Sequence, residues 1–296
     1  YAQGRIGSGT ATYVLESLGS LAVGPLGTGV LPAAGGGPLT QHAELEGGQI
    51  ALYKFTVPAG VQAMQVRLLN RTGNPVFALT PGTNAPYPHV PAGLGNNYGA
   101  EGGWFTERRE GATILTWANP TNGNWTLTLK AEMEGGEFPD AACDMEIVAL
   151  SASPLAFNNG AANVSNHEGD TWRYYVVTVP ASAQGWNLRL RDFAGGKPLM
   201  VVRKDLRPDS FNDLGYGNDH WLDGGQLPVY NDLSGRTQNA DDTSNYGKLI
   251  AFGMGHPLTN GSYYVGVYNS DATEANYTLE SRGIGAGLAI VPLELP

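Results

Sequence analysis

The densest group of potential metal ligands in the sequence lies between residues 205 and 247, where aspartates and asparagines alternate with glycines and aromatic residues. Calcium binds six to eight oxygen ligands from carboxylates and carbonyls, and this composition can supply them. The segment therefore predicts a calcium site, although it contains no EF-hand pattern. In the alternative interpretation the same residues form solvated turns, because Asp and Asn bond their own backbone. The candidate ligands are Asn212, Asp213, Asn218, Asp219 and Asp223.

Aromatic residues in the same segment suggest a binding surface. Tyr216, Trp221 and Tyr230 lie among the acidic residues, and aromatic faces beside Asp and Asn suit a sugar or a peptide. In the alternative interpretation the long loop folds back and these rings cover the sandwich. The sequence thus predicts an extracellular polysaccharide or protein as a possible ligand, with both interpretations open.

Catalytic motifs are missing from the sequence. None of the histidines falls in an H-E-x-x-H or H-x-H arrangement, and there is no G-x-S-x-G elbow. The single cysteine, Cys143, excludes an internal disulfide and any site built from several cysteines. Because it falls in an expected strand, we interpret it as a buried apolar thiol. We expect no enzymatic activity. The histidines are His42, His89, His167, His220 and His256.

The overall composition narrows the class of protein. The net charge is -10, and Lys and Arg are scattered, which argues against nucleic-acid binding. No apolar run is long enough to span a bilayer. Thr, Val, Tyr and Trp occur in short runs separated by Gly, Asn, Asp and Pro, which indicates many short strands joined by turns.

An internal repeat organises these strands. Residues 47–69 align without a gap to residues 169–191, and 9 of the 23 positions are identical. In each copy, apolar residues alternate on both sides of a Pro-centred turn. This pattern predicts two half-buried antiparallel strands joined by a short turn. Later segments also correspond: 73–82 with 196–205, and 120–129 with 257–268.

A closing strand ends each repeat and occurs once more near the start of the chain. Residues 144–149 and 276–281 are the two closing strands, and residues 12–17, which read TYVLES, resemble them. An even spacing of 132 residues supports the set, with Tyr13, Met145 and Tyr277 at corresponding positions. These residues, and the Leu or Ile two positions later, are expected to face a core.

An opening segment with a Pro-Leu pair follows each closing strand, at residues 21–26, 151–156 and 289–294. We therefore predict an all-β fold of two tandem jelly-roll-like antiparallel β-sandwich domains with extra terminal strands. The glycine-rich residues 24–37 lack the Gly-Lys-Ser/Thr end of a phosphate loop and are interpreted as a flexible linker. The predicted divisions are residues 1–20 for a closing-strand segment, 21–150 for the first sandwich, 151–284 for the second and 285–296 for a terminal strand segment.

The repeats resemble the bacterial pre-peptidase C-terminal domain family. The resemblance rests on YKFTVPAG at 53–60, YYVVTVPAS at 174–182, GSYYVGVY at 261–268 and NYTLES at 276–281. It implies a compact jelly-roll sandwich of secreted and surface proteins, usually beside a catalytic or adhesive region. Some members of the family bind calcium or extracellular polymers.

Two functions fit these features. In the first, the chain is an exported, non-catalytic structural protein of a bacterial cell surface or extracellular matrix. Its copies would assemble head to tail into fibres, as terminal strands add to a neighbouring sandwich. In the second, it is a calcium-binding or polymer-binding accessory module of a larger secreted enzyme or adhesin. The self-assembly candidates are Tyr13, Leu15, Ile290, Val291 and Leu293.

Overall fold

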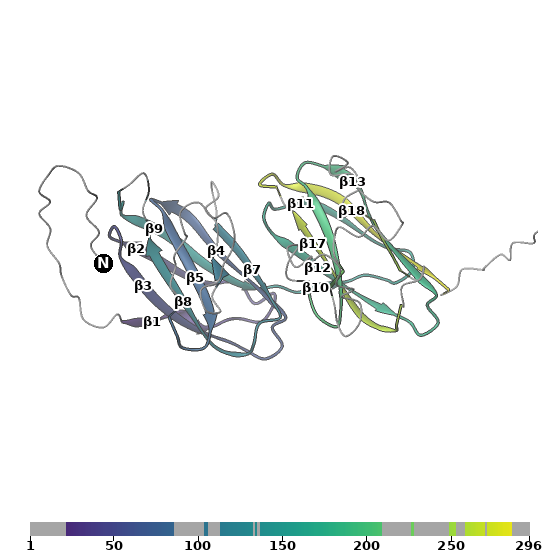
Figure 1. The fold of residues 1–296 in the computed structure, drawn as a ribbon, viewed down its shortest axis with the longest axis horizontal. Coiled ribbons are helices and arrows are strands. Elements are labelled where there is room, and N and C mark those ends of the chain that lie inside the picture. Colours follow the sequence, from purple (N-terminus) through teal and green to yellow (C-terminus); the bar gives the residue numbers. More distant parts are fainter. Residues whose placement is uncertain are drawn as a thin grey trace, which may run out of the picture.

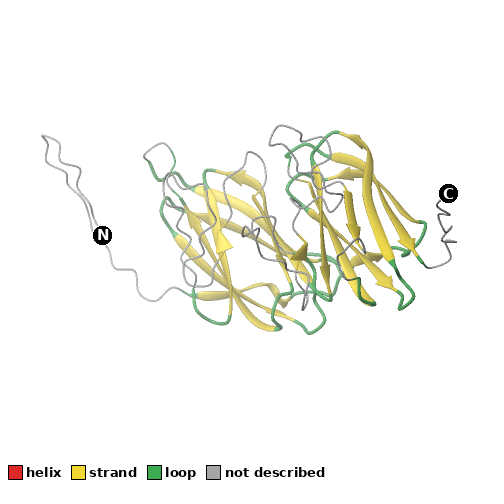
Figure 2. Ribbon diagram, turned by 45° about the vertical axis from the view of Figure 1, so that its right-hand side comes forward, coloured by secondary structure: helices red, strands yellow, loops and turns green. Residues whose placement is uncertain are grey.

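The structure is a computed structural model. It describes residues 22–85, 104–105, 113–132, 134, 137–208, 226–227, 249–252, 258–269 and 271–285. Every regular element in these residues is a strand, as Figure 2 shows. The strands form four sheets, which build two β-sandwiches in tandem. The prediction of an all-β sandwich fold is confirmed.

The first sandwich pairs a five-stranded sheet, in the order β1-β3-β8-β5-β6, with a four-stranded sheet, in the order β2-β9-β4-β7. Its strands are β1 (Val23–Val30), β2 (Leu39–Leu45), β3 (Ile50–Val57), β4 (Ala63–Thr72), β5 (Pro75–Pro81), β6 (Trp104–Phe105), β7 (Thr113–Ala118), β8 (Gly123–Ala131) and β9 (Ala141–Ala149).

The second sandwich repeats this arrangement, with sheets in the orders β10-β12-β17-β14-β15 and β11-β18-β13-β16. Its strands are β10 (Ala152–Pro154), β11 (Gly160–His167), β12 (Trp172–Val179), β13 (Gly185–Ala194), β14 (Pro198–Lys204), β15 (Gln226–Leu227), β16 (Leu249–Phe252), β17 (Gly261–Asn269) and β18 (Ala275–Ile284). The two sandwiches lie end to end along the long axis (Figure 1).

The alternating residues of the repeat form the two cores, as predicted. Phe55 and Val57 of β3 face Met64, Val66 and Leu68 of β4 in the first core, and all five are nearly or fully buried. The corresponding residues of β12 and β13 form the second core. Each pair of strands, however, lies in two different sheets. The Pro-centred turn is therefore an arch that carries the chain across the core, so that each strand presents its apolar face from the opposite side.

The opening strands correct two predictions. Residues 23–30 are a strand, β1, and not part of a linker, since β1 pairs with β3 and places Leu26 at 0% exposure in the core. β1 also runs parallel to β3, and β10 runs parallel to β12. The other pairs of named strands are antiparallel. Because β2 lies in the opposite sheet, the chain crosses the core twice before β3, and β3 then has the same direction as β1.

The Pro-Leu pairs of the opening segments occupy matching positions. Pro25 pairs with Lys54, and Pro154 pairs with Val176, which corresponds to Lys54 in the second repeat. Leu26 and Leu155, the residues that follow the prolines, are both buried. The similarity of 21–26 and 151–156 thus reflects equivalent strands, while residues 289–294 lie outside the described residues.

The closing strands β9 and β18 are inner strands of the four-stranded sheets. β9 pairs with β2 and β4, and β18 pairs with β11 and β13. Met145, Ile147, Tyr277 and Leu279 face the cores, as predicted. The predicted alignment of β9 with β18 is wrong by two residues, however. Met145 lies opposite Leu68, and Leu279 lies opposite Leu190, the repeat equivalent of Leu68. Met145 therefore corresponds to Leu279. A shift of two keeps the same face inward, and this is why the burial prediction still holds.

Candidate functional site

The residues that the sequence marked for chemistry lie outside the described part of the chain. This applies to the candidate calcium ligands Asn212, Asp213, Asn218, Asp219 and Asp223, to the aromatic residues Tyr216, Trp221 and Tyr230, and to the assembly residues Tyr13, Leu15, Ile290, Val291 and Leu293. Their roles stay predictions. Within the described ranges, no three His, Cys, Asp or Glu side chains form a group that could hold a metal ion.

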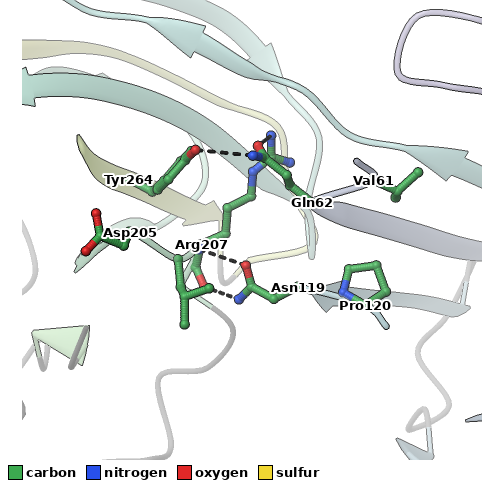
Figure 3. Close-up of a pocket in the computed structure, with 8 residues that line it drawn as sticks. Val61, Gln62, Asn119, Pro120, Asp205, Arg207 and Tyr264 are labelled. Carbon is green, nitrogen blue, oxygen red and sulfur yellow. Dashed lines mark hydrogen bonds between the residues drawn. The ribbon is translucent and has the colours of Figure 1, made fainter. Parts of the chain in front are cut away.

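The structure shows a half-open cavity of about 230 Å³ between the two sandwiches (Figure 3). The first sandwich contributes the turn after β3 and the turn between β7 and β8. The second contributes the residues after β14 and one residue of β17. The lining residues are Val61, Gln62, Asn119, Pro120, Asp205, Leu206, Arg207 and Tyr264.

Arg207 is the central residue of this junction, and only 3% of it is exposed. One terminal nitrogen of its guanidinium donates to the carbonyl of Leu150 at 2.6 Å, and the other donates to Oε1 of Gln62 at 3.0 Å. The amide nitrogen of Gln62 in turn donates to the Tyr264 hydroxyl at 3.3 Å. A side chain from the second sandwich therefore holds groups of the first sandwich and of the connection between the two.

The backbone of Arg207 is held by a reciprocal pair of hydrogen bonds. Its N–H donates to Oδ1 of Asn119 at 3.0 Å, and its carbonyl accepts from Nδ2 of Asn119 at 2.9 Å. Asn119 has a φ of +53°, a left-handed conformation that Asn tolerates better than most residues. This backbone shape ends β7 and turns the amide toward the second sandwich.

No carboxylate of the described residues pairs with Arg207, and its described surroundings show how the charge is accommodated. Burial lowers the pKa of its guanidinium, while the neighbouring tyrosines Tyr174 and Tyr264 oppose this effect. The guanidinium carbon lies 5.1 Å from the centre of the Tyr174 ring and 5.8 Å from that of Tyr264. Cation–π attraction and two carbonyl acceptors thus replace an ion pair.

Apolar contacts continue the junction beside Arg207. Trp172 and Tyr174 of β12 are stacked with a centroid distance of 5.8 Å. They pack with Val201 of β14 against Ala63, the first residue of β4. An ion pair of 2.8 Å between Arg67 of the first sandwich and Glu168 of the second also joins the two sandwiches. The junction therefore combines a small apolar cluster with directed polar contacts between the two sandwiches.

The polar side chains at the junction serve mainly to hold the two sandwiches together. Gln62, Asn119 and Arg207 use their polar groups in hydrogen bonds between the sandwiches. Among the lining residues, Asp205 and Tyr264 remain as groups that could accept or donate a proton. Among the described lining residues, neither is accompanied by a Ser, Cys or Lys nucleophile, so these residues form no pair of a base and a nucleophile.

A second polar group lies on the outer face of the four-stranded sheet of the first sandwich. Nδ1 of His42 lies 2.7 Å from Asp144 Oδ1, and Asn70 donates to the other oxygen of Asp144 at 2.7 Å. Hydrogen bonds from the His42 ring to the carboxylates of Asp144 and Glu44 raise the pKa of His42. Those from Asn70 and His42 lower the pKa of Asp144. These side chains are exposed and come from neighbouring strands of one sheet. We therefore interpret the group as a hydrogen-bonded network on the protein surface.

The two buried reactive side chains are structural. His167 has 0% exposure, and its Nδ1 lies 2.9 Å from the Tyr277 hydroxyl. Its Nε2 lies 3.2 Å from the carbonyl of Thr171, which can only accept, so Nε2 carries the proton and Tyr277 donates to Nδ1. Cys143 of β9 is 1% exposed in the first core, and burial raises its pKa to about 12. This confirms the interpretation of Cys143 as a buried apolar thiol.

Comparisons with known proteins assign no family. No protein-family model matches the chain, and no curated protein matches it significantly. The glycoside hydrolase domain of Spr0440, Endo-D from Streptococcus pneumoniae R6, aligns over 53% of this chain and 25% of its own, with 12% identity and a TM-score of 0.22. The STIV MCP structure aligns over 84% of this chain and 97% of its own, with 8% identity and a TM-score of 0.21. Similarities this low carry no functional argument.

The sequence analysis missed the junction residues. Arg207 falls within the acidic segment 205–247 and Gln62 within the repeat 47–69, and no sequence motif includes Asn119. One signal was present: Arg207 is a basic residue inside a segment dominated by aspartates. Its partner groups are a side-chain amide and a backbone carbonyl, however, and neither leaves a charge pattern in a sequence.

Proposed function

We propose that the protein is a non-catalytic structural component of an extracellular surface or matrix, whose copies assemble head to tail through terminal strands. The observation that carries the proposal is the shape of the molecule. β1 enters the first sandwich at one end of the long axis, and β18 leaves the second sandwich at the opposite end (Figure 1). A unit of this form propagates a chain of contacts along one direction.

The fixed junction supports the same function. A structural unit has to transmit load between its two halves, and here Arg207, Asn119 and the Trp172 cluster join them directly. The main polar groups of the junction cavity take part in this attachment, which supports a non-catalytic role. An exported location rests on the sequence features alone. The described residues contain no helix able to span a membrane.

Electron microscopy of the purified chain, with and without residues 1–20, tests the proposal. The full chain is expected to form filaments with a regular repeat along their axis, and removal of residues 1–20 should leave single particles of two linked sandwiches. Monodisperse single particles of the full chain, over a range of protein and salt concentrations, would contradict the proposal.

A second candidate is a calcium-binding or polymer-binding accessory module. It is favoured by the place where the acidic segment begins, since Asp205, Leu206 and Arg207 line the junction cavity. A ligand held by that segment would lie next to the contact between the sandwiches. Calcium should then raise the melting temperature and a chelator should lower it, because an ion bound to the native state stabilises it. An unchanged melting temperature excludes the ion site.

A further inference from the structure

The inward face of β18 has a distinct set of residues. Between positions 275 and 283 every second residue is buried, and the intervening ones are more exposed. The side chains on this face make specific contacts in the second sandwich. The Tyr277 hydroxyl lies 2.9 Å from Nδ1 of His167, and the Ser281 hydroxyl lies 2.8 Å from Nε1 of Trp186. The buried residues are Ala275, Tyr277, Leu279, Ser281 and Gly283.

Gly283 is the most restrictive of these positions. A Cβ atom at Gly283 would lie 2.1 Å from a ring carbon of Phe157, which is far inside contact distance. Phe157 itself is packed against Trp186, with ring centres 6.1 Å apart. A strand that enters this position must therefore carry glycine at the place of Gly283.

Residues 11–19 carry the same inward face. Aligned with 275–283, they match at each of the five buried positions and at Glu280, and they differ at most of the outward positions. Side chains alternate between the two faces of a strand, so a segment that matches the inward residues can make the same contacts with the core. The matching residues are Ala11, Tyr13, Leu15, Glu16, Ser17 and Gly19.

The closing strand of the first sandwich does not have this face. By strand register, the residues of β9 that correspond to the five buried positions of β18 share only the alanine. The residue equivalent to Trp186 in the first sandwich is Met64, which has no N–H to donate to a serine. The corresponding residues of β9 are Ala141, Cys143, Met145, Ile147 and Ala149. Residues 11–19 therefore fit the second sandwich and not the first.

From this match we infer that residues 11–19 of one copy occupy the position of β18, between β11 and β13, in the second sandwich of a neighbouring copy. The inference rests on the proposed function and specifies its contact. Tyr13 would take the place of Tyr277 beside His167, and Ser17 would take the place of Ser281 beside Trp186. The interface is thus a strand replacement, in which a strand with the same inward face as β18 joins the sheet of a neighbouring copy.

The exchange disturbs little of the receiving sandwich. β18 pairs only with β11 and β13, so its departure breaks no pairing among the other strands. Glu16 supplies the carboxylate that Glu280 offers to Arg191 of β13. The contacts in the receiving groove are the same before and after the exchange, whereas the displaced β18 loses its pairings with β11 and β13. The linked form therefore needs a protein concentration at which residues 11–19 of a neighbour can compete with the β18 of the same chain.

Disulfide trapping in the full chain tests this register. Asn163 of β11 is the partner of Thr278, and their side chains are hydrogen-bonded at 3.2 Å. Val14 takes the place of Thr278 in the aligned segment. Directly opposed residues of antiparallel strands have a Cα separation that a disulfide can bridge. The variant V14C/N163C should therefore give a ladder of disulfide-linked multimers under mild oxidation.

Control variants show whether the ladder reports the proposed contact. The variant N163C/T278C should give a disulfide within one chain, and the single variants V14C and N163C should give no ladder. In the V14C/N163C background, Gly19→Val should reduce the multimer yield at least about tenfold, because the added side chain meets Phe157. Leu18→Val, at the place of the exposed Arg282, should leave the yield within about twofold.

The outcomes separate this inference from the proposed function. Filaments that form without the V14C/N163C ladder overturn the inference and leave the proposed function standing. A disulfide within a single V14C/N163C chain also overturns it, since residues 11–19 would then pair inside their own copy. Absence of both filaments and multimers contradicts the two together. A ladder that Gly19→Val leaves intact contradicts the register.

Discussion

His167 is a histidine that folding keeps neutral. Burial lowers its pKa from 6.5 to about 4, and both ring nitrogens are already hydrogen-bonded in the neutral form. The unfolded chain takes up a proton near pH 6.5, whereas the folded chain resists it until about pH 4. The contribution of His167 to stability is therefore complete above pH 6.5 and is lost as the pH falls toward 4.

We predict that this loss amounts to roughly 3 kcal/mol across that window. Urea unfolding of the wild type and of His167→Gln, at steps from pH 7 to pH 4, measures it. The glutamine variant should be less stable at pH 7 but should show a shallower decline. Parallel declines for the two proteins would show that His167 does not carry the pH dependence.

His42 is expected to act in the opposite direction. Its pKa is raised by Asp144 and Glu44, so its contribution is present below the ordinary pKa and is lost as the pH rises through the raised value. Because the group is exposed, the effect should be small and should weaken with salt. His42→Gln should reduce the salt dependence of stability near pH 6 and leave stability at pH 9 unchanged. A salt dependence equal to that of the wild type would refute this assignment.

Cys143 provides a chemical test of the first core. Its thiol is buried and its pKa is raised to about 12, so almost none is ionised at neutral pH. Because the thiolate is the reactive form, an alkylating reagent at pH 8 should leave the folded protein unmodified and should label it fully in urea. Mass spectrometry gives the stoichiometry. Rapid labelling without denaturant would place Cys143 outside the core.

At the scale of single elements, β1 shows whether the first strand belongs to the sandwich. Leu26 is fully buried, whereas Val23 on the same strand is 45% exposed. Leu26→Ala should lower the free energy of unfolding by about 2–5 kcal/mol, because it leaves a cavity in the first core. Val23→Ala, the matched control, should stay within about 0.5 kcal/mol. Equal and small effects in urea unfolding would favour a loosely attached segment.

The strands that sequence could predict are those with strong alternation. β3, β4, β12 and β13 follow the repeat, and their inward residues are the ones expected. β1 was interpreted as part of a linker because glycines surround its one buried residue, Leu26, and the strand has no alternating apolar pattern. Gly27 and Gly29 have positive φ values, so this strand is irregular as well as glycine-rich. Partner strands could not be assigned, since alternation reports which face is buried and not which sheet contains the strand.

The closing strands show the same limit in their register. Sequence placed Met145 at the position of Tyr277, and the pairing with β4 shows that it corresponds to Leu279. Alternation has a period of two, so alignments that differ by two residues bury the same face and cannot be distinguished by hydrophobicity. Only the backbone pairing with a neighbouring strand separates them. The junction was harder still, because it depends on Arg207 meeting a backbone carbonyl.

At the scale of the whole molecule, Arg207 should decide whether the two sandwiches unfold together. Arg207→Met removes the donors for the Leu150 carbonyl and Gln62, and each buried acceptor left unpaired costs about 1–3 kcal/mol. We expect one calorimetric transition for the wild type and two separate transitions for the variant. Arg207→Lys should be intermediate, since a single ammonium group cannot replace the planar fork.

The control for this experiment is Lys54→Ala, which removes an exposed positive charge from the outer side of the first sandwich. Its unfolding profile should match that of the wild type. Two transitions already present in the wild type would show that the junction does not couple the sandwiches, and Arg207 would then be a local contact.

The position of β18 between β11 and β13 also has a consequence for the time course of folding. During synthesis both flanking strands are made before β14, β16 and β17, and β18 is made after all of them. Until β18 emerges, the edges that will receive it are open to any strand with the right face. Residues 11–19 have that face and are translated before the strands of both sandwiches. Residues 11–19 of a neighbouring chain can therefore compete for the place of the last strand, so dilution during refolding should favour the closed monomer and a high protein concentration the linked form.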